Sequence, residues 1–417
     1  MWSVISAAFI GPGTVTTAVT AGSQFQLQLL WTVLFATLGC IVLQEISARI
    51  IIASGLTFGG ALEKKFGINK GLKFKWLVAL PVLLGCAAYE AGNILGAVSG
   101  MNLLREGDGR VYTVVVTLLS AIVLWRGGSK WISVVMTVLV GMMGVAFLFL
   151  ALESDFDFSE MLISSVVPVL PAGSEWIALA LVGTTIVPYN IFIGSAISKG
   201  QTIPLMRVGL AISVLIGGMI TAWILIAGTM VESFASFSEV ALALQNKIGA
   251  LGPLALGIGL FAAGFSSAIT SPYAASLIAS TVFGSEKKGV IRAVWIAVLL
   301  TGFLFGYSGI KPIPVILTVQ ALNGFILPLL TYFLILIVND ERVVPKVHQH
   351  ANWYNLILLA ILGVTLLIGL NNVDKAIING FGLNVTDHFI IVLVITVASI
   401  AATVIQLLNI KKSQGSL

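Results

Sequence analysis

Two short stretches of the chain combine helix-breaking residues with hydroxyl side chains. The first is Gly11-Pro12-Gly13-Thr14, and the second is Thr184-Thr185-Ile186-Val187-Pro188. Proline and paired glycines interrupt a helix because they remove hydrogen bonds and add backbone freedom. The amides that begin the next helical segment then attract negatively charged or polar ligands. These stretches therefore mark a candidate binding site, and simple proline kinks are the alternative interpretation.

The background in which these stretches lie is strongly apolar. Of 417 residues, 58% are hydrophobic and only 9% are charged, whereas a soluble domain carries about a quarter charged residues. Mean hydropathy is +1.06, so we expect most of the chain to lie in lipid. No charged segment precedes the first apolar run and no cleavage site ends it, which predicts a retained span. Cys40 and Cys86 are expected to be packing residues.

Apolar runs of membrane length predict an all-α integral membrane protein with about 12 transmembrane helices and one transmembrane domain, 1–417. A helix break inside the bilayer persists only where it lines a cavity or is buried in protein. The expected spans are 2–23, 28–55, 74–103, 111–125, 131–152, 175–198, 205–231, 253–283, 290–310, 313–338, 354–370 and 388–410.

Basic residues predict the orientation of these spans. With the N-terminus in the cytoplasm, the inside loops hold most of the 22 lysines and arginines. The outside loops keep only Arg105, Arg110, Lys247, Lys311 and Lys375. We therefore expect a multi-pass protein of the cell (inner) membrane. Basic loops that flank the membrane account for the pI of about 9.2 without a nucleic-acid partner.

The positions of the two breaks predict internal symmetry. They fall in the first and sixth spans, which are equivalent positions of two five-helix units. Inverted-repeat transporters place a midplane substrate site between such broken helices. We expect a first repeat at 1–153, an inverted second repeat at 174–338, and two further helices at 354–410. No phosphate-cradling loop or nucleophile triad is present in the sequence, so an enzyme is not expected.

Several ordered motifs resemble the Nramp family of metal transporters. The resemblance implies two inverted five-helix repeats (spans 1–5 and 6–10) in a LeuT-type fold, alternating access, and a site between helices one and six. The motifs are Ala21-Gly22-Ser23-Gln24-Phe25 with Gln28-Leu29-Leu30-Trp31, Gln44-Glu45 with Ala48-Arg49, Val187-Pro188-Tyr189-Asn190, Ala262-Ala263-Gly264 with Ser266-Ser267, and Gln320-Ala321-Leu322-Asn323-Gly324 with Pro328-Leu329.

The same resemblance implies that the metal-binding side chains are replaced. Family metal transporters read DPGN in helix one, where this chain has Gly11 and Thr14 in place of aspartate and asparagine. The methionine ligand and the following histidine of helix six correspond to Val187 and Tyr189. Of an acidic pair in helix three only Glu90 remains. We therefore expect no bound metal, and the sequence is most similar to a divergent branch associated with bicarbonate transport.

A small anion is the substrate that this interpretation favours, with bicarbonate as the specific choice. Without a neighbouring carboxylate, the helix amides no longer repel anions, and hydroxyl and amide groups donate further hydrogen bonds. Alternatively, the threonines bond back to their own helices. The candidate substrate-binding residues are Gly11, Gly13, Thr14, Thr16, Thr17, Asn93, Thr184, Thr185, Val187, Tyr189, Asn190 and Asn323.

Two other functions stay open from the sequence. One is transport of a divalent cation, Mg²⁺ or Mn²⁺, carried with part of its water shell. The other is a non-transporting sensor that reuses the fold. Oligomeric state is not indicated by the sequence.

Four further residues are candidates for ion coupling. Ser266, Ser267 and Thr270 lie on the eighth span, which in the wider fold supplies hydroxyls to a Na⁺ ion beside helix-one carbonyls. Helix packing by these small residues is the alternative. Glu90 is the acidic residue expected near mid-membrane, where ionisable side chains are functional by default.

Overall fold

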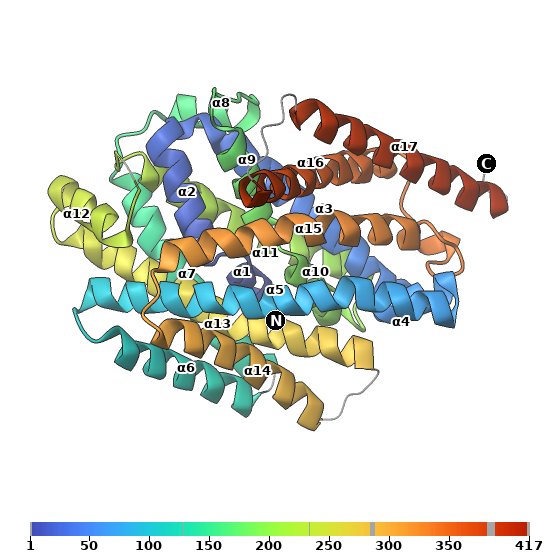
Figure 1. Cartoon of the computed structure of the whole chain (residues 1–417), viewed down its shortest axis with the longest axis horizontal. Helices are drawn as coiled ribbons and strands as arrows, with labels where there is room; N and C mark the ends of the chain where they lie inside the picture. The colour runs from blue at the N-terminus through green and yellow to red at the C-terminus, as the bar shows by residue number, and fades with distance from the viewer. Residues whose placement is uncertain (1, 128, 233, 284–287, 382–387, 415–417) are drawn as a thin grey trace.

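A computed structural model describes residues 2–127, 129–232, 234–283, 288–381 and 388–414. Within these ranges the chain is helical, without strands (Figure 1). The helices are α1 (Ser3–Phe9), α2 (Pro12–Phe25), η1 (Gln26–Leu29), α3 (Leu30–Ser54), α4 (Phe58–Phe66), α5 (Ile68–Leu104), α6 (Gly109–Arg126), α7 (Ser129–Leu152), α8 (Phe158–Val166), α9 (Glu175–Thr185), α10 (Pro188–Ser198), α11 (Ile203–Gly228), α12 (Phe237–Ile248), α13 (Leu251–Phe283), α14 (Lys288–Tyr307), α15 (Pro312–Val338), η2 (Lys346–His348), α16 (Tyr354–Phe381) and α17 (His388–Ser413).

Each predicted span coincides with a helix or with a pair of helices. The first span is α1 with α2, and the sixth is α9 with α10. By length and apolar composition, nine stretches of the described ranges can cross a membrane, one of which, Pro12–Ser54, joins α2 to α3. α15 and α16 add the shorter apolar segments Ile326–Val338 and Tyr354–Leu370. The all-α membrane architecture is confirmed, whereas the proposed repeat boundaries and the orientation stay predictions.

Three short helices lie in segments that the sequence analysis treated as loops. α4, α8 and α12 each begin at a side chain that caps the first turn: Thr57 accepts from the Gly60 amide, Asp157 from the Ser159 amide and Ser236 from the Glu239 amide. Such caps stabilise a helix end locally. A search for apolar runs of membrane length does not detect helices this short.

The centre of the molecule is built on α5 and α13, which run side by side (Figure 1). Glycines allow this close approach: a Cβ at Gly264 would lie 2.3 Å from the Ala97 amide nitrogen, and one at Gly100 would lie 2.4 Å from that of Phe261. Small residues at helix interfaces bring backbones together in this way. α1 and α10 pack against α13 on one side, and α14 packs against both α5 and α13. This scaffold holds the broken helices in place.

Candidate functional site

The first break separates α1 from α2 at two extended residues. Ile10 has φ −114° and ψ 111°, and Gly11 has φ −121° and ψ 178°. α2 then starts with Pro12 at its first position, where the missing amide of proline costs no helical hydrogen bond. The sequence prediction of an interrupted first span is confirmed.

The second break separates α9 from α10 in the same manner. α9 ends at Thr185, Ile186 and Val187 are non-helical, and α10 starts with Pro188. Val187 is buried. Both breaks therefore present the first turn of a new helix next to an extended segment.

Side chains satisfy four consecutive carbonyl groups at the first break. Ser266 Oγ donates to Ala7 O at 3.4 Å, and Asn190 Nδ2 donates to Ala8 O at 2.8 Å. Thr14 Oγ1 donates to Phe9 O at 3.4 Å, and Ser267 Oγ donates to Ile10 O at 3.2 Å. Backbone groups freed inside a membrane need such partners. The structure thus brings α10 and α13 to the break in helix one.

The remaining threonines of the candidate site bond within their own helices. Thr16 Oγ1 donates to Pro12 O at 2.8 Å, and Thr17 Oγ1 donates to Gly13 O at 2.9 Å. Thr184 and Thr185 both donate to Leu181 O, at 3.2 and 2.8 Å. This is the alternative arrangement that the sequence allowed. Their contact with a substrate stays a prediction.

On α5, Asn93 connects Glu90 to the first break. Asn93 Nδ2 donates to Glu90 Oε2 at 3.3 Å, and Asn93 Oδ1 lies 3.7 Å from the position of a Cβ at Gly11. Glu90 is fully buried, and within the described part of the chain its Oε1 has no hydrogen-bond partner. One turn along α5, a Cβ at Gly96 would lie 2.2 Å from Pro12 Cγ. α5 therefore contacts the broken segment directly.

The other candidate residues differ in burial and in the contacts that they make. Tyr189 is buried and stacks edge-on with Tyr89, with ring centroids 5.8 Å apart. Thr270 is buried, and its Oγ1 donates to Ser267 O at 3.5 Å. Asn323 lies on α15, but its side chain is outside the described residues. Apart from Asn323, the predicted residues lie in the two breaks, at Gly11 and Val187, or on α2, α5, α9, α10 and α13, which meet around these breaks.

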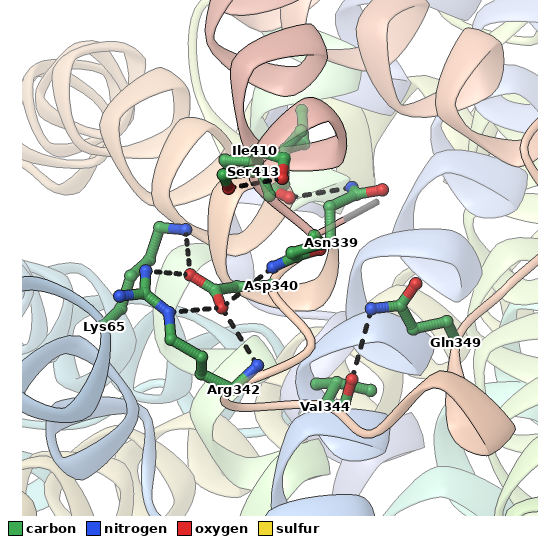
Figure 2. Close-up of polar contacts among 10 residues, drawn as sticks. Lys65, Asn339, Asp340, Arg342, Val344, Gln349, Ile410 and Ser413 are labelled. Carbon is green, nitrogen blue, oxygen red and sulfur yellow. Dashed lines mark hydrogen bonds and ion pairs between the residues drawn. The ribbon is translucent and has the colours of Figure 1, made fainter. Parts of the chain in front are cut away.

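Two ion clusters near the predicted cytoplasmic side were missed by the sequence analysis, which counted their basic residues as topology signals and quoted Glu45 with Arg49 only in a family motif. Figure 2 shows the first, in which Asp340 accepts from Lys65 Nζ at 2.8 Å and from Arg342 Nη2 at 2.7 Å. In the second, Glu45 on α3 accepts from Arg49 and from Arg207 of α11. Glu45 and Arg49 stand four positions apart on one helix, a spacing that the sequence itself offers. The pairs Lys65–Asp340 and Arg207–Glu45 are 275 and 162 positions apart, so no local signal identifies them.

Burial and neighbouring charges shift the pKa values of the first cluster in opposite directions. Burial by itself would raise the pKa of Asp340, but the hydrogen bonds from Arg342 and Lys65 outweigh it and lower that pKa to about 2. For Lys65 burial dominates and lowers the pKa, against the raising effect of Asp340. Asp340 therefore remains ionised although its carboxyl is buried.

The family model for natural resistance-associated macrophage protein-like (Nramp) proteins matches residues 3–373. The chain belongs to the Nramp family. Nramp proteins are transporters, which agrees with the multi-pass architecture of this one.

Solved structures similar to this Nramp protein share its fold. A manganese transporter from Eremococcus coleocola superposes with a TM-score of 0.79 at 17% identity, covering 98% of this chain and 92% of that one. MhsT in complex with L-phenylalanine gives 0.61 at 16% identity, covering 89% and 97%. Mhp1, a nucleobase-cation-symport-1 family transporter, gives 0.59 at 15%, covering 99% and 92%. The LeuT-type fold is confirmed.

The polar centre of this Nramp protein contains few metal-ligating side chains. Among the residues that the structure describes, no group of three or more His, Cys, Asp or Glu side chains is placed to hold a metal ion. Hydroxyl and amide groups take the place of acidic ligands at the first break. The substrate must therefore be inferred from oxygen atoms, helix ends and the single carboxyl of Glu90.

Proposed function

We propose that the protein transports a divalent cation, Mg²⁺ or Mn²⁺, carried with part of its water shell, by alternating access between the two broken helices. The observation that carries this proposal is the carboxyl of Glu90. It is fully buried, it retains an oxygen without a partner in the described ranges, and Asn93 joins it to the break at Gly11. Divalent cations of this class prefer oxygen ligands.

The hydrogen bonds around the break also favour a cation. Asn93, Asn190 and Ser267 each use one side-chain donor, on Glu90 and on two backbone carbonyls. Oxygen acceptors remain, including Asn190 Oδ1, which has no partner among the described residues. A centre whose side-chain donors are partly used while carboxyl and amide oxygens remain without partners in the described ranges suits a positively charged substrate better than an oxyanion.

A single carboxylate limits how far the cation is dehydrated. Mg²⁺ gives up its waters reluctantly and is often held by one or two carboxylates with several waters retained. The loss of further acidic ligands therefore fits a hydrated ion better than a bare one. The similar fold of the Eremococcus coleocola manganese transporter supports the choice of a cation as substrate class.

Isotope uptake into proteoliposomes tests this proposal. We expect saturable Mg²⁺ or Mn²⁺ uptake that is absent from empty liposomes. Labelled bicarbonate, measured in the same preparation, provides the opposing arm. Bicarbonate uptake without uptake of either cation would overturn the proposal.

Bicarbonate is the second candidate, and the helix ends favour it. The first-turn amides of α2, at Gly13 and Thr14, and of α10, at Tyr189, have no partners within their helices, and no carboxylate occupies position 11 beside them. Such amides bind anions. Uptake measured with and without a Na⁺ gradient tests coupling through Ser266, Ser267 and Thr270. If neither Mg²⁺, Mn²⁺ nor bicarbonate is taken up, the sensor function is favoured.

A further inference from the structure

A cavity of about 490 Å³ opens between α3, α11 and the segment that leads into α16. Its volume lies within the usual range for small-ligand sites, about 300–1,000 Å³. It contains none of the candidate substrate-binding residues. Its wall includes Glu45, Arg207, Leu210, His350, Trp353 and Tyr354.

The polar end of this cavity carries excess positive charge. Glu45 is buried and is bound by Arg49, which is also buried, and by Arg207 Nε at 2.9 Å. The Arg207 side chain is 54% exposed, so its terminal nitrogens face outward from this pair. Lys411 of α17 donates to Asn352, next to the cavity wall. Two arginines thus contact one carboxylate, and a lysine lies next to the cavity wall.

His350 adds a hydrogen-bonding group. Its Nδ1 lies 3.0 Å from Ala351 O, an acceptor, so the proton of the neutral ring is on Nδ1. Its Nε2 is then an acceptor, and within the described ranges this atom is buried without a partner. The cavity therefore offers a cationic donor at Arg207 and a neutral acceptor at His350.

The wall changes from polar to apolar along α11. Arg207 lies in the first turns after the helix begins at Ile203, and Leu210 follows one turn deeper. Trp353 is 63% exposed at the rim. This wall combines an exposed tryptophan, basic side chains and an apolar inner part. Such a combination is typical of protein surfaces at the interface between lipid headgroups and acyl chains. The basic-residue distribution predicts that this interface belongs to the cytoplasmic leaflet.

We propose that this cavity binds the headgroup of an anionic phospholipid, of the phosphatidylglycerol type, from the cytoplasmic leaflet. The phosphate contacts the terminal nitrogens of Arg207, and a glycerol hydroxyl donates to His350 Nε2. Arginine is well suited to phosphate because its planar fork presents several donors. Basic pockets between transmembrane helices on this side of a membrane bind anionic headgroups.

Native mass spectrometry of the purified full chain tests this site. The protein is released from mixed micelles that contain equal amounts of phosphatidylglycerol and phosphatidylcholine. We expect preferential retention of phosphatidylglycerol, and about a tenfold weaker retention in Arg207→Gln, which removes a charge-assisted hydrogen bond. Lys73→Gln is the matched control, since Lys73 is an exposed basic residue of α5 outside the cavity.

Additional arms separate the possible outcomes. Arg207→Lys keeps the charge, so it should lose less phosphatidylglycerol retention than Arg207→Gln. Lys411→Gln, next to the cavity wall, should also weaken retention. It tests the site even if Arg207→Gln does not purify as a monodisperse protein. Millimolar glycerol phosphate should not displace the lipid, because it lacks acyl chains. Equal retention of both lipids by the wild-type protein, or unchanged phosphatidylglycerol retention in Arg207→Gln and Lys411→Gln, would overturn the proposal.

Discussion

Ser267 donates its hydroxyl to the carbonyl oxygen of Ile10 at 3.2 Å, although the two residues are 257 positions apart. The same Oγ lies 3.1 Å from the position of a Cβ at Gly11. α13 thus donates a hydrogen bond to the break in helix one, and it can approach the break closely because Gly11 has no side chain. Any side chain added at position 11 points toward Ser267 and Asn93.

Gly11→Asp is the substitution that this contact makes most informative. The new carboxylate lies beside Ser267 and Asn93 and adds an anionic ligand, so we expect a lower half-saturation concentration for Mn²⁺ uptake, by about tenfold. Proteoliposome uptake measures it. Gly11→Ala adds the same Cβ without charge and serves as the control. If bicarbonate is instead the substrate, the aspartate abolishes its uptake through repulsion.

Glu90→Gln tests the carboxyl on which the cation proposal depends. The substitution keeps the volume and the hydrogen bond with Asn93 while it removes the charge. We expect at least about a tenfold loss of Mg²⁺ or Mn²⁺ uptake, since an uncompensated dication is strongly disfavoured in a low-dielectric site. Glu239→Gln, at the exposed start of α12, is the control. Undiminished cation uptake in Glu90→Gln would contradict the proposed role.

Asn190→Ala removes the hydrogen bond that joins α10 to α1. The Ala8 carbonyl then has lost its side-chain donor in a buried position, which costs about 1–3 kcal/mol. We expect a lower thermal unfolding temperature for the detergent-solubilised protein. Thr20→Ala is the comparison, because Thr20 is partly exposed and bonds only to Thr16 O of its own helix. Equal stability of the two variants would show that the bridge contributes little.

Asp340 links the stability of the protein to pH. Because its pKa is lowered to about 2, from about 3.9 in an unfolded chain, its ionised form stabilises the folded state at pH values above 3.9. That stabilisation is lost as the pH falls toward 2. We expect the unfolding temperature to fall between about pH 4 and about pH 2, and Asp340→Asn to remove this part of the pH dependence.

The same aspartate has a second measurable effect at neutral pH. Asp340→Asn leaves the buried ammonium of Lys65 without its counter-charge, which costs about 3–5 kcal/mol. Arg342→Gln removes a cation whose side chain is 65% exposed, and its effect should be below about 1 kcal/mol. Similar unfolding temperatures for these two variants would contradict the assignment of Lys65 as the buried member.

The sequence by itself determined the spans, the two breaks and the family. Membrane-length apolar runs and the residues Pro12 and Pro188 act locally, since bilayer thickness dictates helix length and proline dictates where a helix starts. The same local logic missed α4, α8 and α12, because short capped helices carry no membrane-length signal. It also placed hydroxyl groups near the breaks without showing where they donate.

Only the tertiary structure decided how those groups are used. The bonds from Asn190 to Ala8, from Ser267 to Ile10 and from Lys65 to Asp340 join residues 182, 257 and 275 positions apart. No local pattern encodes such partners, since they depend on which helices the fold brings together. This pairing uses several of the donors that the sequence analysis had assigned to an anion and leaves one oxygen of Glu90 without a partner among the described residues, and this favours a cation as the substrate.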